Sequence, residues 1–560
     1  MSLTHPLCVY INWAAFDELS DVIEHTESFA LKQLDQLLHL KQFGVQFDAY
    51  ILDAFWYDPD SGYRAWRTPH WSAGPERFLS RCQENAVIPG LWFTTNVFCH
   101  FNAIPAWQDS VSDSGKSLCM FHGGFMDHFA QTLQLYYDQG FRMFKMDFAD
   151  FYAAPAHIRA SMPKDEIYRR NVAAWRETLV QFKKQCPEAY LLAYNGYGGW
   201  QEDTVTPFSH SVDPDWLDYF DCMYSGDPRP ADLPCLHFWR SKDIYSDHMI
   251  RYYQYAGLPL PRIDNAGFSI GTTGCVFYRG VQAWKGMLLL SFARGGLMNT
   301  IYGDLELLSD TDADWFARVQ TLFFHFQQHG VIATFGGIPG NAEPYGYYAG
   351  DDSGCVFTVL NPSHAFVTVR LPRGDRFAGP LENGRVLFRD AGVVPQVSDD
   401  SITLGPEQLA VVGFGRYADQ TYDLGIQNDV VIPRDIQPLE YTVVEQSPKN
   451  MRVALSVPRC DAVLVLMRQL SSDGRAYRSK GGSPPDGVFM DAILKISATH
   501  NASALPVRVE YDKQIWCGLS WAAGQIDATG LAPDEQLLIQ CSTEEQADVR
   551  LELSIYQLAW

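Results

Sequence analysis

Aspartates stand at the ends of several short apolar runs between residues 50 and 304. These residues are Asp53, Asp147, Asp227, Asp264 and Asp304. Cleavage of a glycosidic bond needs one carboxylate that attacks or stabilises the developing oxocarbenium carbon, and a second carboxyl group that protonates the departing oxygen. Two of these aspartates, if the fold brings them together, form a candidate catalytic pair.

Asp147 has the sequence environment of a nucleophile. Lys145 precedes it by two residues, and side chains two apart in a strand point to the same face of the sheet. A neighbouring ammonium group favours the ionised carboxylate, which is the form that attacks. We expect Asp147 to be the nucleophile and Lys145 to lie beside it at the substrate-binding site.

Two aspartates compete for the role of proton donor. Asp227 follows Gly226 and precedes Pro228, where a sharp turn can present the partly desolvated carboxyl group that a general acid needs. Asp243 is the alternative acid/base, although an aspartate at this place also suits the cap of a helix that contains residues 249–255. The residues alone leave both assignments open.

The segment that follows Asp53 is rich in aromatic residues. It contains Phe55, Trp56, Tyr57, Tyr63, Trp66, His70 and Trp71. The apolar faces of pyranose rings pack on such side chains, while carboxylates and amides bind the hydroxyl groups. The alternative is that the segment is buried for structural reasons. With the ends of other apolar runs, the predicted substrate-binding residues are Trp13, Asp53, Trp56, Trp92, Lys145, Asn195 and Asp264.

Eight short runs rich in β-branched and aromatic residues alternate with longer helical patterns. The runs are 7–13, 47–54, 88–94, 142–147, 190–195, 219–224, 260–263 and 297–302. This alternation is typical of βα units and a parallel sheet, and eight units predict a (β/α)8 TIM barrel. In such barrels the catalytic groups lie at the carboxyl ends of the strands, which is where the aspartates fall.

After the barrel the pattern changes to short alternating runs separated by Gly, Pro, Asp and Asn. This texture is typical of antiparallel β-sandwich domains. We therefore predict a catalytic barrel over residues 1–340, a small β-sandwich over residues 341–415 and a second β-rich domain over residues 416–560.

The chain of 560 residues carries 43 Lys+Arg against 66 Asp+Glu, a formal net charge of −23, and 47% of its residues are hydrophobic. The apolar content excludes a disordered chain, and the acidic charge disfavours nucleic acid and anionic membranes as partners. The first basic residue is Lys32, so we expect no secretory signal and a cytoplasmic protein. The 12 cysteines form no C-x-x-C pair and no nucleotide motif is present, so no cofactor or metal is expected.

The motifs around these residues resemble the α-galactosidase clan of glycoside hydrolases over roughly residues 7–415, particularly family 36 with its raffinose and stachyose synthases, and more distantly family 27. Lys145-Met146-Asp147 is similar to the clan's Lys-x-Asp on strand four, whose aspartate is the nucleophile. Residues 225–230 resemble the Ser-Asp-Asp-x-x-Pro segment of the synthases, whose second aspartate is the acid/base and corresponds to Asp227. Residues 239–244 resemble a family 27 segment with one residue deleted, which keeps Asp243 as the alternative.

The resemblance implies a retaining hydrolase that releases terminal α-linked sugars by double displacement, without a cofactor and with a small carbohydrate as its partner. Asp53-Ala54 stands where members that bind galactose usually carry tandem aspartates, so the sugar's identity stays open, as does the oligomeric state. Two alternatives remain. One is transfer to a sugar acceptor, as in raffinose synthases, and the other is a catalytically degenerate carbohydrate-binding protein.

Overall fold

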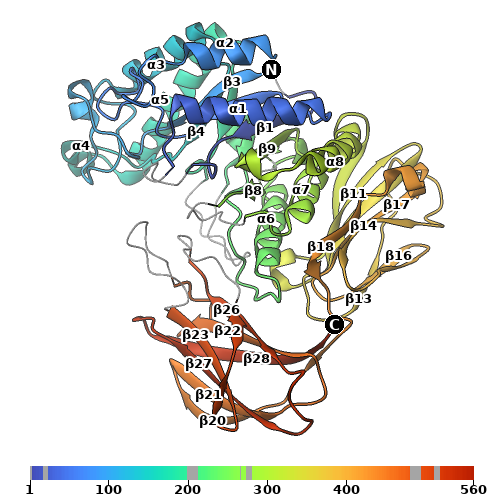
Figure 1. The fold of residues 1–560 in the computed structure, drawn as a ribbon. Coiled ribbons are helices and arrows are strands. Elements are labelled where there is room, and N and C mark those ends of the chain that lie inside the picture. Colours follow the sequence, from blue (N-terminus) through green and yellow to red (C-terminus); the bar gives the residue numbers. More distant parts are fainter. Residues whose placement is uncertain are drawn as a thin grey trace. The chain divides into compact units, whose positions relative to one another are not determined.

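Figure 1 shows the computed structural model of the chain, which describes residues 3–16, 23–198, 212–264, 267–272, 280–479, 493–509 and 518–560. The chain forms two compact units. The first comprises Met1–Gly226, Tyr252–Ala266 and Gly296–Gln320, and the second comprises Asp227–Arg251, Gly267–Gly295 and Thr321–Trp560. Residues 227–251 and 267–295 therefore fold with residues of the C-terminal half.

Eight parallel strands of a nine-stranded sheet belong to the first unit. They are β1 (Leu7–Ile11), β2 (Ala49–Leu52), β3 (Ile88–Thr94), β4 (Met143–Asp147), β5 (Tyr190–Ala193), β6 (Cys222–Tyr224), β7 (Ile263–Asp264) and β9 (Met298–Gly303). Each strand overlaps one of the eight predicted runs, and their order in the sheet is β7-β6-β5-β4-β3-β2-β1-β9. All neighbouring pairs run parallel. The predicted parallel sheet is confirmed.

The two ends of this strand order approach each other. Leu297 N, just before β9, donates to Pro261 O at 3.1 Å. Thr300 Oγ1 of β9 donates to Asp264 Oδ1 of β7 at 2.6 Å. The sheet is therefore curled in the manner of a TIM barrel, and its strict (β/α)8 form stays a prediction.

Alternate side chains of the strands share one buried interior. Its apolar members include Leu7, Val9, Ile11, Ala49, Ile51, Met143, Leu192, Cys222 and Met298. Because side chains alternate along a strand, the same face continues to Asp53 just after β2 and to Lys145 and Asp147 in β4. The interior is thus apolar over most of the strand length and charged at the carboxyl ends, where barrel enzymes hold their catalytic groups.

Helices lie between these strands along the chain of the first unit and are labelled in Figure 1. They are α1 (Glu27–Gln42), α2 (Glu76–Glu84), α3 (Phe125–Gln139), α4 (Ala156–Ser161) and α5 (Lys164–Gln185). Thr26 caps α1, since its Oγ1 accepts from Phe29 N at 3.1 Å. Leu31, Leu34 and Leu37 form the buried stripe of α1, as their spacing predicts.

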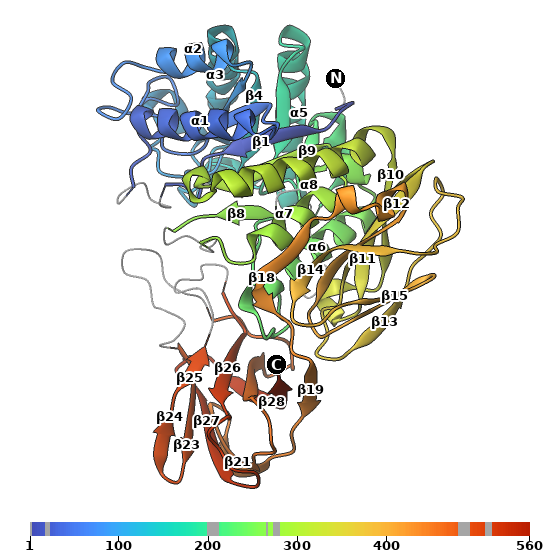
Figure 2. The same cartoon turned by 45° about the vertical axis from the view of Figure 1, so that its right-hand side comes forward.

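The second unit contains β8 (Phe268–Ile270), α7 (Trp284–Ala293) and most of α6 (Phe238–Tyr255). Helix α8 (Asp310–His329) precedes the β-rich residues in the chain. One hydrogen bond joins α7 to a strand of the second unit. Gly286 N of α7 donates to Gln427 Oε1 of β18 (Gly425–Val431) at 2.7 Å. Figure 2 labels both elements. Among the described residues, no helix is long and apolar enough to cross a membrane.

Two sheets follow α8 and share one apolar core. The larger has the order β10 (Val331–Gly336), β11 (Tyr345–Asp351), β12 (Gly354–Leu360), β17 (Leu409–Gly415), β14 (Arg385–Ala391) and β18. The smaller has the order β13 (Val367–Arg370), β16 (Ser401–Leu404) and β15 (Gln396–Ser398). Phe357, Val412 and Ile402 from the two sheets lie in a common cluster. This pair of sheets is the predicted small β-sandwich, and its domain limits remain predictions.

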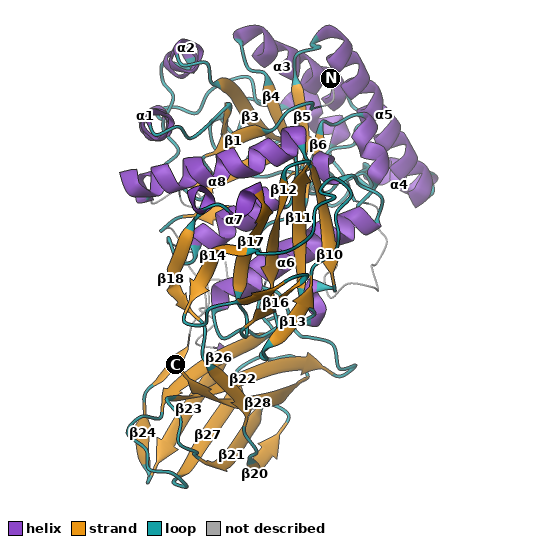
Figure 3. Cartoon of the chain, turned by 90° about the vertical axis from the view of Figure 1, so that its right-hand side faces the viewer, coloured by secondary structure: helices purple, strands orange, loops and turns teal. Residues whose placement is uncertain are grey.

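Two further antiparallel sheets end the chain. One has the order β19 (Asp435–Pro438), β28 (Val549–Ala559), β22 (Ala462–Ser471), β26 (Trp521–Asp527) and β25 (Val507–Val509). The other has the order β20 (Thr442–Ser447), β21 (Asn450–Ser456), β27 (Gln536–Thr543), β23 (Leu494–His500) and β24 (Ser503–Leu505). Figure 3 shows that strands dominate the described chain after α8, as the sequence texture predicts.

Candidate active site

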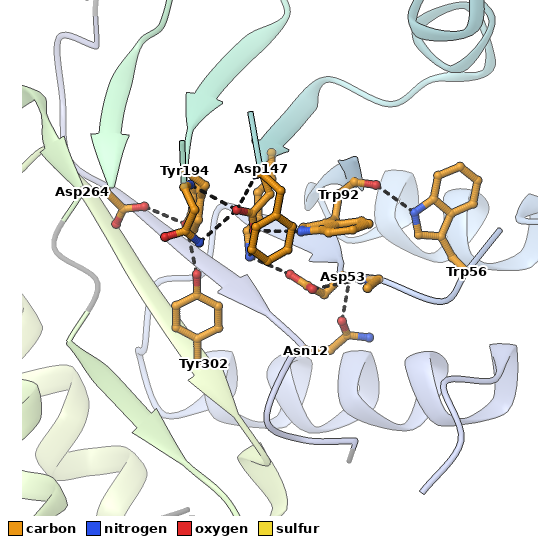
Figure 4. Close-up of polar contacts among 12 residues, drawn as sticks. Asn12, Asp53, Trp56, Trp92, Asp147, Tyr194, Asp264 and Tyr302 are labelled. Atoms are coloured by element: carbon orange, nitrogen blue, oxygen red, sulfur yellow. Dashed lines mark hydrogen bonds and ion pairs between the residues drawn. The ribbon is translucent and has the colours of Figure 1, made fainter. Parts of the chain in front are cut away.

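Five of the predicted site residues meet at the carboxyl ends of neighbouring strands in the first unit. They are Asp53, Trp92, Lys145, Asp147 and Asn195, which come from β2 to β5 or the residues just after them (Figure 4). Each strand contributes because the parallel sheet aligns its carboxyl ends along one edge.

Both carboxylate oxygens of Asp147 are held by hydrogen bonds. Oδ1 accepts from Phe148 N at 2.9 Å, from Asn195 N at 3.1 Å and from Asn195 Nδ2 at 2.9 Å. Oδ2 accepts from the indole Nε1 of Trp92 at 3.1 Å. With only 4% of its surface exposed, Asp147 is a buried and precisely oriented carboxylate.

Lys145 lies between two carboxylates. Its Nζ is 2.8 Å from Asp53 Oδ2 and 3.9 Å from Asp147 Oδ2. The ammonium also lies over the rings of Tyr194, Tyr302 and Trp13, at 4.3, 5.4 and 6.0 Å from their centroids. The charge is therefore shared between Asp53 and Asp147 in an aromatic enclosure, and the shorter contact goes to Asp53.

Burial raises the pKa of Asp147 above its ordinary value. Lys145 and the hydrogen bonds from Trp92 and Asn195 act in the opposite direction, and Asp53 adds to the rise. The net direction is upward because desolvation is the largest influence. Lys145 therefore favours the ionised form of Asp147 without fully offsetting the effect of burial.

Phe148 is a site residue that the sequence reasoning missed. Its φ of 47° lies in the left-handed region, which L-residues rarely adopt, and this turn directs its N–H at the Asp147 carboxylate. Its side chain is 39% exposed, and its ring lies 6.3 Å from that of Trp92. An aromatic residue directly after a strand-end aspartate was the available signal.

Asp53 is held by a buried support that the sequence did not reveal. Asp53 N donates to Asn12 Oδ1 at 2.9 Å, and Ala54 N donates to Asp53 Oδ1 at 2.9 Å. His25 contacts Asn12 Nδ2 and Ala54 O, both at 2.7 Å. Burial lowers the pKa of His25 to about 4, so the imidazole is neutral near pH 7. Asn12 and His25 thus fix the loop that presents Asp53.

Trp56 lies behind the site. It is fully buried, and its Nε1 donates to Trp92 O at 3.0 Å. Its ring packs among the neighbouring aromatic residues Tyr57, Tyr63, Trp66 and Phe93. The structure thus shows the alternative considered for this segment: Trp56 supports Trp92 from within the core and offers no exposed face to a sugar.

Asp264 is enclosed between strands. It accepts from Tyr194 Oη at 2.8 Å and from Thr300 Oγ1 at 2.6 Å, and it has no exposed surface. Tyr302 Oη donates to Tyr194 Oη at 3.2 Å, which extends the chain of hydrogen bonds (Figure 4). Asp264 therefore links β7 to β5 and β9 rather than facing an open pocket. Asp304 accepts from Glu306 N at 3.1 Å as the cap of a short 3-10 helix.

Asp227 and Asp243 belong to the second unit. The Asp227 side chain is 18% exposed and lies 3.7 Å from Arg229 Nη2, and Gly226 before it has a φ of 100°, as expected of a sharp turn. Asp243 is 3% exposed, and its Oδ2 accepts from Arg240 Nη1 at 3.0 Å. Asp227 is therefore the more accessible of the two carboxyl groups.

Arg240 connects Asp243 to the small β-sandwich. Its Nη2 donates to Asp390 Oδ2 at 2.8 Å, and Asp390 is wholly buried. Although burial disfavours the charged guanidinium, Asp390 and Asp243 raise the pKa of Arg240 above its usual value. Asp243 therefore balances a buried cation, which is a structural use of its charge.

The fold of this chain is similar to those of solved structures. The GH36 α-galactosidase AgaA of Geobacillus stearothermophilus, crystallised with raffinose, superposes with a TM-score of 0.50 and 13% identity, over 73% of this chain and 56% of that chain. The galactosidase domain of the α-galactosidase–sucrose kinase AgaSK gives a TM-score of 0.50 and 15% identity, over 74% and 55%.

The likeness is one of fold. The chain has a glycoside hydrolase-like fold and spans a little over half the length of those two proteins. No protein-family model matches the sequence, and no curated protein sequence is significantly similar to it.

Proposed function

We propose that the protein is a retaining glycoside hydrolase that acts on terminal α-linked sugars. The observation that carries this proposal is the Asp147 carboxylate, which is buried at the carboxyl end of β4, held by four hydrogen bonds and placed 3.9 Å from Lys145. The glycoside hydrolase-like fold supports the same reaction class. A carboxylate so fixed suits attack on one carbon centre.

In the proposed first step, Asp147 Oδ2 attacks the anomeric carbon. Oδ1 already accepts three hydrogen bonds, whereas Oδ2 accepts one, so Oδ2 is the oxygen with a lone pair to spare. The bond from the anomeric carbon to the leaving oxygen breaks, and the acid/base gives that oxygen its proton. Water, deprotonated by the same acid/base, then releases the sugar from Asp147 with overall retention.

Asp227 is the proposed acid/base. Its side chain is partly exposed, so a proton can be exchanged with solvent between the two steps. Asp243 remains the alternative, although its ion pair with Arg240 already gives its charge a structural role. Variants of both residues distinguish the two assignments.

Trp92, Lys145, Asp53, Asn195 and Phe148 are the proposed substrate-binding residues around Asp147. Asp53 and Asn195 offer acceptors and donors for ring hydroxyls, and the exposed ring of Phe148 offers aromatic surface, whereas the buried Trp92 orients Asp147 through its indole N–H. Ala54 supplies no second carboxylate at β2, so galactose is one candidate sugar among several.

A panel of aryl α- and β-glycosides, with the product anomer followed by NMR, tests the proposal. Turnover of α-glycosides with retention is the expected result. Retention with efficient transfer to an added sugar favours the transglycosylase alternative. Binding of sugars without turnover of any glycoside in the panel would replace the proposal with a carbohydrate-binding protein.

The pH dependence of kcat/KM reports the ionisation of Asp147. Because its pKa is raised by burial, the protonated and inactive form persists above the ordinary value of 3.8, so activity on the acidic side should fall at a pH above 3.8. Lys145→Met removes the main influence that lowers this pKa and should move the acidic limb to higher pH. An unchanged or lowered limb in the variant would contradict this electrostatic role.

Phe148→Ala should weaken the binding of aryl glycosides. The exposed ring beside Asp147 is proposed to pack on the substrate, so KM should rise about fivefold while kcat changes by less than about threefold. Phe366→Ala is the matched control, because Phe366 is a similarly exposed phenylalanine of the second unit, at 44% against 39%. Equal KM values for both variants and the parent protein would remove Phe148 from the substrate-binding residues.

A further inference from the structure

The second unit contains a cavity of about 330 Å³. It lies among the start of α6, the residues before α7, strands β18 and β25, and Trp560, and every lining residue belongs to the second unit. Its volume is within the range of small-molecule sites, roughly 300 to 1,000 Å³. The cavity therefore has room for one sugar-sized ligand.

Two indole rings line this cavity. They belong to Trp239 and Trp560, which are both partly exposed. The Trp239 Nε1 donates to Gln282 Oε1, and the backbone N of Trp560 donates to Asp461 Oδ2 at 2.7 Å. The first bond holds the Trp239 indole before a ligand arrives, and the second holds the backbone of Trp560. Indole faces in a fixed position are the surfaces on which the C–H face of a pyranose ring packs.

A buried donor without a partner also lines the cavity. Arg240 is 2% exposed, and its two Nη atoms are committed to Asp243 and Asp390. Its Nε has no hydrogen-bond partner in the structure. Buried donors are almost always satisfied, so an exception requires an explanation.

The charges around the cavity balance. Arg240 and Arg508 are matched by Asp243 and Asp429. Asp429 Oδ2 accepts from Ala283 N at 2.6 Å, and Arg508 Nη2 donates to Gln525 Oε1 at 3.0 Å, so these groups are held in place. A lining with equal numbers of both signs favours a neutral ligand with both donors and acceptors over an anion or a cation.

We propose that this cavity is a non-catalytic carbohydrate-binding site that holds a neutral pyranose ring. The ring packs on Trp239 and Trp560, and its hydroxyls bond to Asp429 and Arg508. The site goes beyond the proposed catalytic function, and it rests on the assignment of Asp227 rather than Asp243 as the acid/base, because Asp243 lines the cavity. It also gives a function to the C-terminal β-rich residues, which supply Asp429, Arg508 and Trp560.

Fluorine NMR of the full chain labelled with fluorotryptophan tests this proposal. The protein carries Asp147→Asn so that the probe, raffinose, is not consumed. Trp560→Phe assigns the Trp560 resonance, and Trp92→Phe assigns a second resonance that reports on the Asp147 site. The expected result is a saturable shift of the Trp560 resonance with a Kd in the millimolar range, about what one sugar ring gives.

Arg508→Gln should weaken the binding seen at Trp560 by about threefold or more, since one hydrogen-bonding group is lost. Arg475→Gln is the matched control, because Arg475 is an exposed arginine of the second unit outside the cavity lining, and it should leave the Kd unchanged. Sorbitol, an open-chain polyol, should produce no comparable shift.

Three outcomes would overturn the site: no shift of Trp560 at about 50 mM raffinose, an equal shift with sorbitol, or an unchanged Kd in Arg508→Gln. Failure of the proposed catalytic function is read separately. It appears as an unmoved Trp92 resonance in the Asp147→Asn protein together with absent turnover of aryl glycosides by the parent protein, whatever happens at Trp560.

Discussion

Asp147→Ala should lose nearly all turnover of aryl glycosides, by about 10⁴-fold or more in kcat, because no other described carboxylate occupies its place among Trp92, Phe148 and Asn195. Azide is small enough to enter the space of the missing carboxylate and should restore turnover. The rescued product should be a glycosyl azide whose configuration is inverted relative to the substrate, because only one displacement then takes place.

A matched control separates this effect from a general effect of removing an aspartate. Asp138 is an exposed aspartate in α3 that accepts from Gln134 Nε2 at 2.8 Å, and Asp138→Ala should keep full activity. Turnover is measured for both variants with and without azide, and the product is followed by NMR. Full activity of Asp147→Ala, or azide rescue with retained configuration, would exclude Asp147 as the nucleophile.

Much of the fold was accessible from the sequence because the patterns that determine it are local. Alternating apolar residues and short runs predicted the eight parallel strands, and the two-residue spacing of Lys145 and Asp147 predicted a shared face. The buried stripe of α1 followed from its own periodicity. In each case the information lies within a few residues of the element that it specifies.

The support of the site was not accessible, because it depends on contacts between distant segments. Nothing near Asp53 in the sequence indicates that His25 and Asn12 hold its loop. Asp264 ends a strand as Asp147 does, yet it accepts hydrogen bonds from Tyr194 and Thr300 and so connects neighbouring strands. A strand-end aspartate is thus a candidate by position, and its neighbours in space decide its use.

The ion pairs of Lys145 also depend on contacts between distant segments that the sequence does not reveal. From the sequence, Lys145 had one obvious partner, Asp147, whereas in the structure its closer partner is Asp53, 2.8 Å away. Burial then acts on Asp147 more strongly than the remaining attraction of Lys145. The sequence can place a cation beside a carboxylate, but it cannot say how much water the fold removes from both.

Asp227→Ala should slow substrates with poor leaving groups far more than those with good ones. A proton donor accelerates the departure of an alkoxide by about 10² to 10⁴. A dinitrophenolate leaves without protonation, so the first step with a dinitrophenyl glycoside should slow by less than about tenfold in Asp227→Ala. The measurement is a plot of kcat/KM against leaving-group pKa for a series of aryl and alkyl glycosides. Asp227→Ala should give a steep slope where the parent protein gives a shallow one.

Asp243→Ala completes the comparison with Asp227→Ala, because its expected effect is a loss of stability and not a change in leaving-group dependence. The Asp243 carboxylate is one of two partners of the buried Arg240, and Asp390 is the other. Loss of a buried charge's last partner costs ~3 to 5 kcal/mol. Because Asp390 remains, Asp243→Ala should reduce the free energy of unfolding by less, roughly 2 to 3 kcal/mol. Urea unfolding measures this loss. Per folded molecule, Asp243→Ala should keep the shallow leaving-group slope. A steep slope in Asp243→Ala with a shallow one in Asp227→Ala would reverse the assignment. Only loss of the proton donor makes the rate depend strongly on the leaving-group pKa, because the leaving group must then depart without protonation.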